Sequence, residues 1–189
     1  MYKLLAITLL IATLSCNTNL NKPTIALANS TEVTAPLARM TTVSTELVAT
    51  KEPYEIKMKM NTLENDTFAF EIDMILHNGA HFVSPNATGN FTGKFTLHLD
   101  DNDYLTPVSE LIETPRSVEE FDPHPFVNGN VNWVREDTNY TLKLKSATKE
   151  YFSVKGFIQF TIEPRCTLEK IPIIIKNVKG ELRVELFLC

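Results

Sequence analysis

The sequence predicts an all-β fold, an antiparallel β-sandwich, and three observations support that prediction. Apolar and polar residues alternate over several short stretches, which is the period of a half-buried strand. Residues that favour turns separate these stretches. No stretch of about ten or more residues keeps a helical period. Short alternating strands joined by turns are typical of antiparallel sandwiches.

The predicted strands begin at Tyr54 and continue to the end of the chain. Each places apolar residues on one face and polar or charged residues on the other. The apolar members are Tyr54, Ile56, Met58 and Met60; Phe68, Phe70, Ile72, Met74 and Leu76; Phe95, Leu97 and Leu99; Tyr140, Leu142 and Leu144; Ile158, Phe160 and Ile162; and Leu182, Val184, Leu186 and Leu188. His77-Asn78-Gly79-Ala80 supplies a turn, because Asn-Gly suits positive φ.

Two connections carry further information. The polar, proline-containing passage Glu113–Asn130 is expected to cross between sheets or to lie over one end of the sandwich. Asn177-Val178-Lys179-Gly180 joins the last two strands as a hairpin. If Asn177 pairs with Gly180, Cys189 lies opposite a residue near Leu168, two positions from Cys166. That spacing allows a disulfide, because bridged Cα atoms must come within about 7 Å of each other.

The N-terminus predicts export. Lys3 precedes an apolar run from Leu4 to Leu14, too short to span a bilayer and typical of a secretory signal. Thr13-Leu14-Ser15-Cys16 resembles the lipobox of bacterial lipoproteins, in which the cysteine is acylated after cleavage. We therefore expect residues 1–16 to be a lipoprotein signal peptide with Cys16 as the lipid attachment site. The alternative is an ordinary cleaved signal with a chance cysteine.

Residues 17–50 are rich in Thr, Asn and Ala and contain no glycine and no aromatic residue. Such a segment buries too little surface to offset its ordering entropy, so it is interpreted as a flexible tether. A short strand or helix around Ser44–Ala49 is the alternative. Residues 51–189 then form one domain, within the usual size range.

Charge and hydropathy limit the partners. The net charge is −5, the sequence pI is about 5.4 and no basic cluster occurs, so nucleic acid is not an expected partner. No other run approaches the roughly 20 apolar residues of a membrane span. The expected partners are the membrane, through the lipid anchor, and an envelope protein. The expected location is the bacterial cell envelope, with the periplasmic side favoured.

No cofactor and no metal is expected. The histidines His77, His81, His98 and His124 do not combine with a third ligand that the sequence singles out. Asp100, Asp101 and Asp103 lack the remainder of a calcium-binding loop and are interpreted as a solvated turn. No serine-histidine-aspartate set or glycine-rich phosphate loop is present, so catalysis by such groups is not inferred.

Cys166 and Cys189 remain as an even pair in an oxidising compartment. Three interpretations stay open: a structural disulfide, two unpaired thiols, and a redox-active thiol at Cys166. The third follows from Arg165, whose positive charge beside the cysteine favours the thiolate.

The stretch from about Asn65 to Val184 resembles the N-terminal periplasmic domain of the transmembrane thiol–disulfide interchange (DsbD) family. Three segments carry the resemblance: Phe70–Pro85, Glu113–Phe121 and Val154–Cys166. It implies an immunoglobulin-like β-sandwich, with Cys166 matching the first of two redox cysteines. Thr167–Pro172 contains no second cysteine. The family's activity therefore carries over only if Cys189 substitutes for it, because the resolving thiol must attack intramolecularly.

We therefore expect a binding or presenting module that is not an enzyme, with its interaction surface near Phe82, Arg165 and Phe121. The alternative is a thiol–disulfide exchange partner, similar to protein-disulfide reductases, in which Cys166 and Cys189 are the catalytic residues. A purely structural lipoprotein is the third possibility.

Overall fold

A computed structural model describes residues 46–125 and 127–187. The described residues form strands and no helix. Within them there is therefore no helix long and apolar enough to cross a membrane. The strands are β1 (Leu47–Lys51), β2 (Tyr54–Thr62), β3 (Thr67–Leu76), β4 (Phe82–Val83), β5 (Thr96–Leu99), β6 (Leu105–Pro107), β7 (Ile112–Thr114), β8 (Glu119–Asp122), β9 (Gly129–Val134), β10 (Thr138–Ser146), β11 (Phe152–Ile162), β12 (Thr167–Val178) and β13 (Glu181–Leu186).

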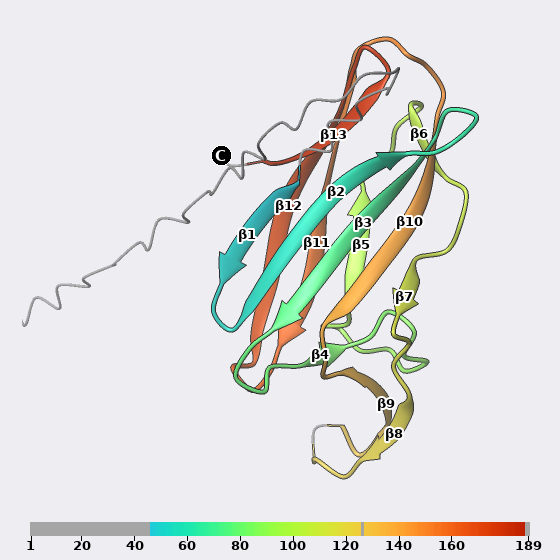
Figure 1. Cartoon of the computed structure of the whole chain (residues 1–189). Coiled ribbons are helices and arrows are strands. Elements are labelled where there is room, and N and C mark those ends of the chain that lie inside the picture. Colours follow the sequence, from blue (N-terminus) through green and yellow to red (C-terminus); the bar gives the residue numbers. More distant parts are fainter. Residues whose placement is uncertain (1–45, 126, 188–189) are drawn as a thin grey trace, which may run out of the picture.

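Two antiparallel sheets form the sandwich (Figure 1). The first has the order β1-β2-β3-β10-β6, with β7 also paired to β10, and the second has the order β13-β12-β11-β5. The strands β2, β3, β10 and β6, given in their order across the sheet, take the places of immunoglobulin strands A, B, E and D. Strands β5, β11 and β12 take those of C, F and G. The predicted all-β, immunoglobulin-like antiparallel sandwich is confirmed, and β1 and β13 extend its two sheets.

The core lies between the sheets and is made by the inward-facing member of each alternating pair. Tyr54, Phe70 and Ile72 are 2%, 0% and 0% exposed, and residues at the ends of the alternating series, such as Leu76, are partly buried against this core. Its centre is aromatic: the rings of Phe95 and Tyr140 stack with centroids 4.1 Å apart. Burying each such side chain contributes about 1.5–3 kcal/mol, which is why the alternation decides the fold.

A small third sheet, β4-β9-β8, is inserted beside the sandwich. Its β8–β9 hairpin hangs over one end of the molecule (Figure 1), which is one of the two positions expected for the passage Glu113–Asn130. The buried Glu113 fixes the start of this passage. Its carboxylate accepts hydrogen bonds from Ser84 Oγ (2.6 Å), Tyr140 Oη (3.2 Å) and the Ser117 amide (2.7 Å).

The C-terminal hairpin corrects the predicted register. Val178 lies opposite Glu181, where the sequence prediction placed Asn177 opposite Gly180. The turn contains only Lys179 and Gly180, both at positive φ (56° and 85°), and the Asn177 side chain accepts from the Gly180 amide at 2.8 Å. A two-residue turn with positive φ at both positions matches the twist of the strands, and glycine adopts positive φ far more readily than the β-branched Val178, so the turn lies one position further along. The predicted position of Cys189 used the other register.

The beginning of the domain also differs from the predicted boundary. Strand β1 (Leu47–Lys51) pairs with β2, so its first four residues fall in the range assigned to the tether and overlap the alternative strand around Ser44–Ala49. Residues 1–45, with the predicted signal peptide and Cys16, lie outside the described residues, as does Cys189. The lipid attachment and the Cys166–Cys189 disulfide stay predictions.

Candidate functional site

A pocket of about 400 Å³ lies at the end of the sandwich under the β8–β9 hairpin. Three segments that are distant in the sequence enclose it: the residue after the turn at 77–80, the β8–β9 hairpin and the loop between β11 and β12. We call this region the pocket end. The lining residues are His81, Asp122, His124, Val127, Trp133, Glu163, Pro164 and Cys166.

The β11–β12 loop presents Cys166 to solvent. Ile162 pairs with Thr167, so the loop consists of four residues, and Cys166 is its last member. Its φ of 50° is in the left-handed region, which residues other than glycine and asparagine rarely adopt. His81 holds the other side of the loop, because its amide donates to the Glu163 carbonyl at 3.1 Å and its carbonyl accepts from the Glu163 amide at 2.8 Å.

The Glu163 carboxylate forms a hydrogen bond with the Cys166 thiol. The thiol donates to Glu163 Oε2 at 3.0 Å, and this hydrogen bond, together with the negative charge, raises the pKa of Cys166 above its ordinary value. Arg165 does not have the predicted effect. Its guanidinium donates to the Glu52 carbonyl at 2.5 Å and to Glu169 Oε1 at 2.6 Å. The expectation that Arg165 favours a thiolate at Cys166 is therefore wrong.

Glu169 connects the pocket end with the first strands of the domain. Its side chain is 4% exposed and accepts from Lys51 Nζ at 2.7 Å and Tyr54 Oη at 3.2 Å, in addition to Arg165. Lys51 belongs to β1 and Tyr54 to β2, so one buried carboxylate ties these strands to the loop that carries Cys166. Burial and the negative charge of Glu169 raise the pKa of Tyr54.

Trp133, the only tryptophan in the chain, forms the aromatic wall of the pocket. Its indole N–H donates to Asp122 Oδ2 at 3.0 Å, and the His81 ring meets it edge-on with centroids 4.9 Å apart. The guanidinium of Arg135 lies 5.5 Å from the ring centroid and pairs with Glu120 at 2.9 Å. The hydrogen bond to Asp122 and the Arg135–Glu120 pair brace the hairpin internally, whereas the His81 ring and the pairing of β4 with β9 hold it to the sandwich.

Two carboxylates, those of Asp122 and Glu163, line the pocket together with the His81 and His124 side chains. The His124 amide donates to Asp122 and Trp133 adds a second hydrogen bond, and together they lower the pKa of the Asp122 carboxyl. The donors to Asp122 and Glu163 are amide, indole and thiol groups. The arginines of the same segments pair elsewhere, Arg135 with Glu120 and Arg165 with Glu169. Within residues 46–125 and 127–187, neither pocket carboxylate forms an ion pair with lysine or arginine.

Of the site residues expected from the sequence, some lie at the pocket and others do not. Cys166 lines the pocket. Phe82 is fully buried against Phe95 and Phe160, so its assignment to the interaction surface is wrong: it belongs to the core. Phe121 is 63% exposed on β8 but does not line the pocket. In the described part of the chain no group of three or more His, Cys, Asp and Glu side chains is arranged to hold a metal ion.

Sequence reasoning missed Trp133, Asp122 and Glu163 as members of one site. The signals available were a single tryptophan in a polar passage and a carboxylate three residues before Cys166. The long-range pairing that unites them, β4 with β9 and His81 with Glu163, leaves no local pattern.

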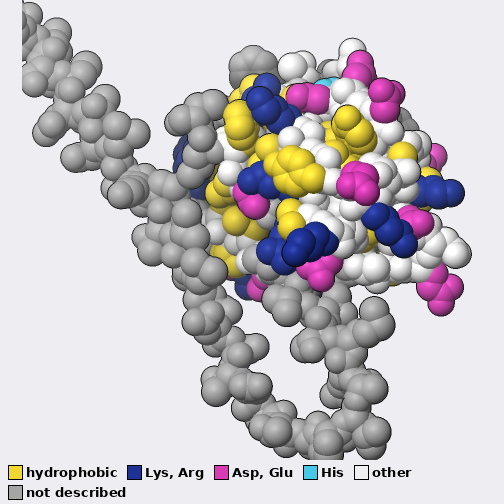
Figure 2. Space-filling model, turned by 90° about the horizontal axis from the view of Figure 1, so that it is seen from above, with side chains coloured by type: hydrophobic (Ala, Val, Ile, Leu, Met, Phe, Trp, Pro, Cys, Tyr) yellow, Lys and Arg dark blue, Asp and Glu magenta, His cyan; other side chains and the backbone are white. Residues whose placement is uncertain are grey.

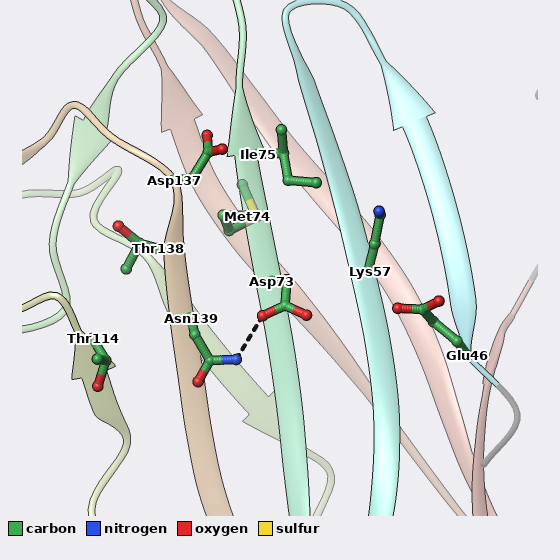
Figure 3. A pocket seen from close by; sticks show the side chains of 9 residues that line it. All are labelled: Glu46, Lys57, Asp73, Met74, Ile75, Thr114, Asp137, Thr138 and Asn139. Carbon is green, nitrogen blue, oxygen red and sulfur yellow. Dashed lines mark hydrogen bonds between the residues drawn. The ribbon is translucent and has the colours of Figure 1, made fainter.

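A second hollow, of about 420 Å³, lies on the outer face of the larger sheet (Figure 3). Lys57, Asp73 and Asn139 form a row across β2, β3 and β10. Asn139 donates to Asp73 at 2.6 Å, and the Asp137 carboxylate accepts from the Leu76 amide at 2.9 Å. Lys57 pairs with Glu55 at 3.2 Å, so these polar groups have partners of their own, and no aromatic residue lines the hollow, which makes it the weaker candidate.

No family model and no curated protein matches this chain. Among solved structures it is similar to the GAE domain of GGA2p from Saccharomyces cerevisiae, with 11% identity and a TM-score of 0.37, over 76% of this chain and 97% of that one. It is also similar to the reduced N-terminal domain of DsbD from Neisseria meningitidis, with 11% identity and a TM-score of 0.40, over 68% and 87%. At these scores the fold assignment rests on the strand order, and membership of the DsbD family stays a prediction.

Proposed function

We propose that this chain is a lipid-anchored envelope protein whose immunoglobulin-like domain binds a protein partner through the pocket end. Cys16 would carry the lipid, residues 17–45 would connect it to the domain, and the periplasmic side of the membrane is favoured.

One observation carries the proposal: an inserted hairpin extends beyond the sandwich and forms a pocket with the loop that carries Cys166. Recognition residues in such folds lie on loops that a rigid sandwich positions. Here the hairpin is held by the pairing of β4 with β9 and by the contact of His81 with Trp133, and the loop by Arg165 and His81. Phe121, next to Asp122 on β8, adds an exposed aromatic ring on the hairpin, a residue type enriched at interfaces.

The same geometry makes thiol–disulfide exchange the weaker alternative. Exchange requires a thiolate, and Glu163 accepts the thiol hydrogen and raises the pKa of Cys166. The thiol is exposed, but the group beside it stabilises its protonated form. Cys166 is therefore proposed as part of a binding surface.

Site-specific photocrosslinking in intact cells tests the proposal. A photoreactive amino acid replaces Phe121 at the pocket end or, as a matched control, Tyr151, which is 69% exposed at the other end of β11. The expected result is a discrete crosslinked protein from position 121 and none from position 151. Equal crosslinking from both positions, or none from 121, would refute the binding role.

For the anchor, Cys16→Ser is expected to release the protein from the membrane fraction.

A further inference from the structure

We infer that the pocket receives a cationic side chain, lysine or arginine, from a basic segment of the partner. This inference rests on the proposed function and specifies the chemistry of the partner.

Charge complementarity is the first argument. Asp122 and Glu163 line the same pocket from the hairpin and from the β11–β12 loop, beside His81 and His124. His124 and Arg135 act on Asp122 from nearby, but among the described residues neither carboxylate forms an ion pair with lysine or arginine. Two like charges around one small cavity repel each other unless a cation lies between them, and a protein cation would supply N–H donors to both.

The wall of the pocket suits the stem of such a side chain. Trp133, Val127 and Pro164 contribute apolar surface beside the two carboxylates. Lysine and arginine place a long hydrocarbon stem against apolar surface while the charged group reaches polar partners. An indole ring is also the best aromatic acceptor for a cation, and Trp133 already meets one, the Arg135 guanidinium 5.5 Å from its centroid. The pocket volume of about 400 Å³ is within the range of small-ligand sites.

The surroundings of the pocket are acidic as well. Residues 118–137 contain five Asp or Glu (119, 120, 122, 136 and 137) and one Arg (135), a balance of −4 within a chain of net charge −5. The opposite end of the sandwich differs, because basic and acidic side chains are interspersed among hydrophobic ones there (Figure 2). The net negative charge of this segment favours approach by a basic segment of a partner.

Fluorescence of Trp133 tests the inference directly, because the chain contains no other tryptophan. The full chain is titrated with acetylated, amidated Gly-Lys-Gly and Gly-Arg-Gly, and with the same lysine peptide acetylated at its amine. A saturable change with the two cationic peptides, and affinity for the neutral one lower by about tenfold or more, is expected. No saturable change, or equal affinity for the neutral peptide, would overturn the inference.

Substitutions locate the site. Asp122→Asn and Glu163→Gln keep the shape of each side chain, and each is expected to lower the affinity for the cationic peptides by about tenfold. Asp101→Asn, an exposed change in the turn after β5, is the control and should leave affinity unchanged. Unchanged affinity in both pocket variants would also overturn the inference.

The two proposals fail separately. If position 121 crosslinks a partner equally well in the Asp122→Asn/Glu163→Gln variant and the peptides do not bind, the inference is wrong and the binding role stands. If the peptides bind but no partner crosslinks, the pocket is a cation site and the proposed function is wrong.

Discussion

Glu169→Ala tests how the loop that carries Cys166 is held to the body of the domain. The substitution removes the acceptor that Lys51, Tyr54 and Arg165 share. All three donors stay in place, so the cost depends on how well each can find water instead.

The expected loss follows from the exposure of the three donors. The Tyr54 residue is 2% exposed, and a buried hydroxyl left without a partner costs about 1–3 kcal/mol. The Lys51 and Arg165 side chains are 59% and 40% exposed, so each lost ion pair costs only about 0.2–1 kcal/mol. Together these changes predict that the free energy of unfolding falls by about 2–4 kcal/mol.

Urea unfolding of the full chain, followed by Trp133 fluorescence, measures this loss. Tyr54→Phe removes the orphaned hydroxyl, so the double variant should be about 1 kcal/mol more stable than the sum of the single effects predicts. Glu185→Ala, which breaks the exposed pair with Lys176, is the matched control and should cost less than about 1 kcal/mol. A loss below about 0.5 kcal/mol for Glu169→Ala, or additive effects with Tyr54→Phe, would refute the reasoning.

Three further predictions concern the pocket end and the core. Glu163→Gln removes the charge that raises the pKa of Cys166, so the pH profile of its alkylation should move to lower pH and the reaction at fixed mildly alkaline pH should accelerate; an unmoved profile contradicts this. In thermal unfolding, Phe82→Ala should lower the free energy of unfolding by about 3–5 kcal/mol and Phe121→Ala by less than about 0.5 kcal/mol. Similar losses for the two variants would contradict the burial of Phe82. Cys166→Gly should leave stability unchanged or raise it by up to about 1 kcal/mol, because its φ of 50° favours glycine; a clear loss in urea unfolding would show that the side chain contributes packing.

The fold could be predicted because each long strand has its own local pattern. Tyr54, Ile56, Met58 and Met60 alternate with polar residues in the sequence, and all four are buried in β2. Burial of one face is a local consequence of the period of a strand, so no knowledge of distant residues was needed. The C-terminal register was harder, because it depended on which residues accept positive φ.

The site depends on long-range contacts that leave no local pattern in the sequence. Phe82 lies in a strand of two residues, too short for a period to show that its ring points inward. Arg165 is adjacent to Cys166 in the chain, yet its guanidinium binds Glu52 and Glu169. The pocket joins Trp133 to Glu163 through pairings between residues far apart in the sequence, and only the folded chain brings them together.

The central claim is that a protein covers the pocket end in the envelope. The most direct measurement is the rate at which a maleimide labels Cys166, resolved by peptide mass spectrometry, in intact cells and in the purified chain after mild reduction. Cys166 is exposed in the isolated domain, so the account predicts much slower labelling in cells. A cysteine introduced by Tyr151→Cys at the opposite end serves as the reference and should react alike in both. If Cys166 shows the same ratio of rates as this reference, no partner covers the pocket end and the account is contradicted.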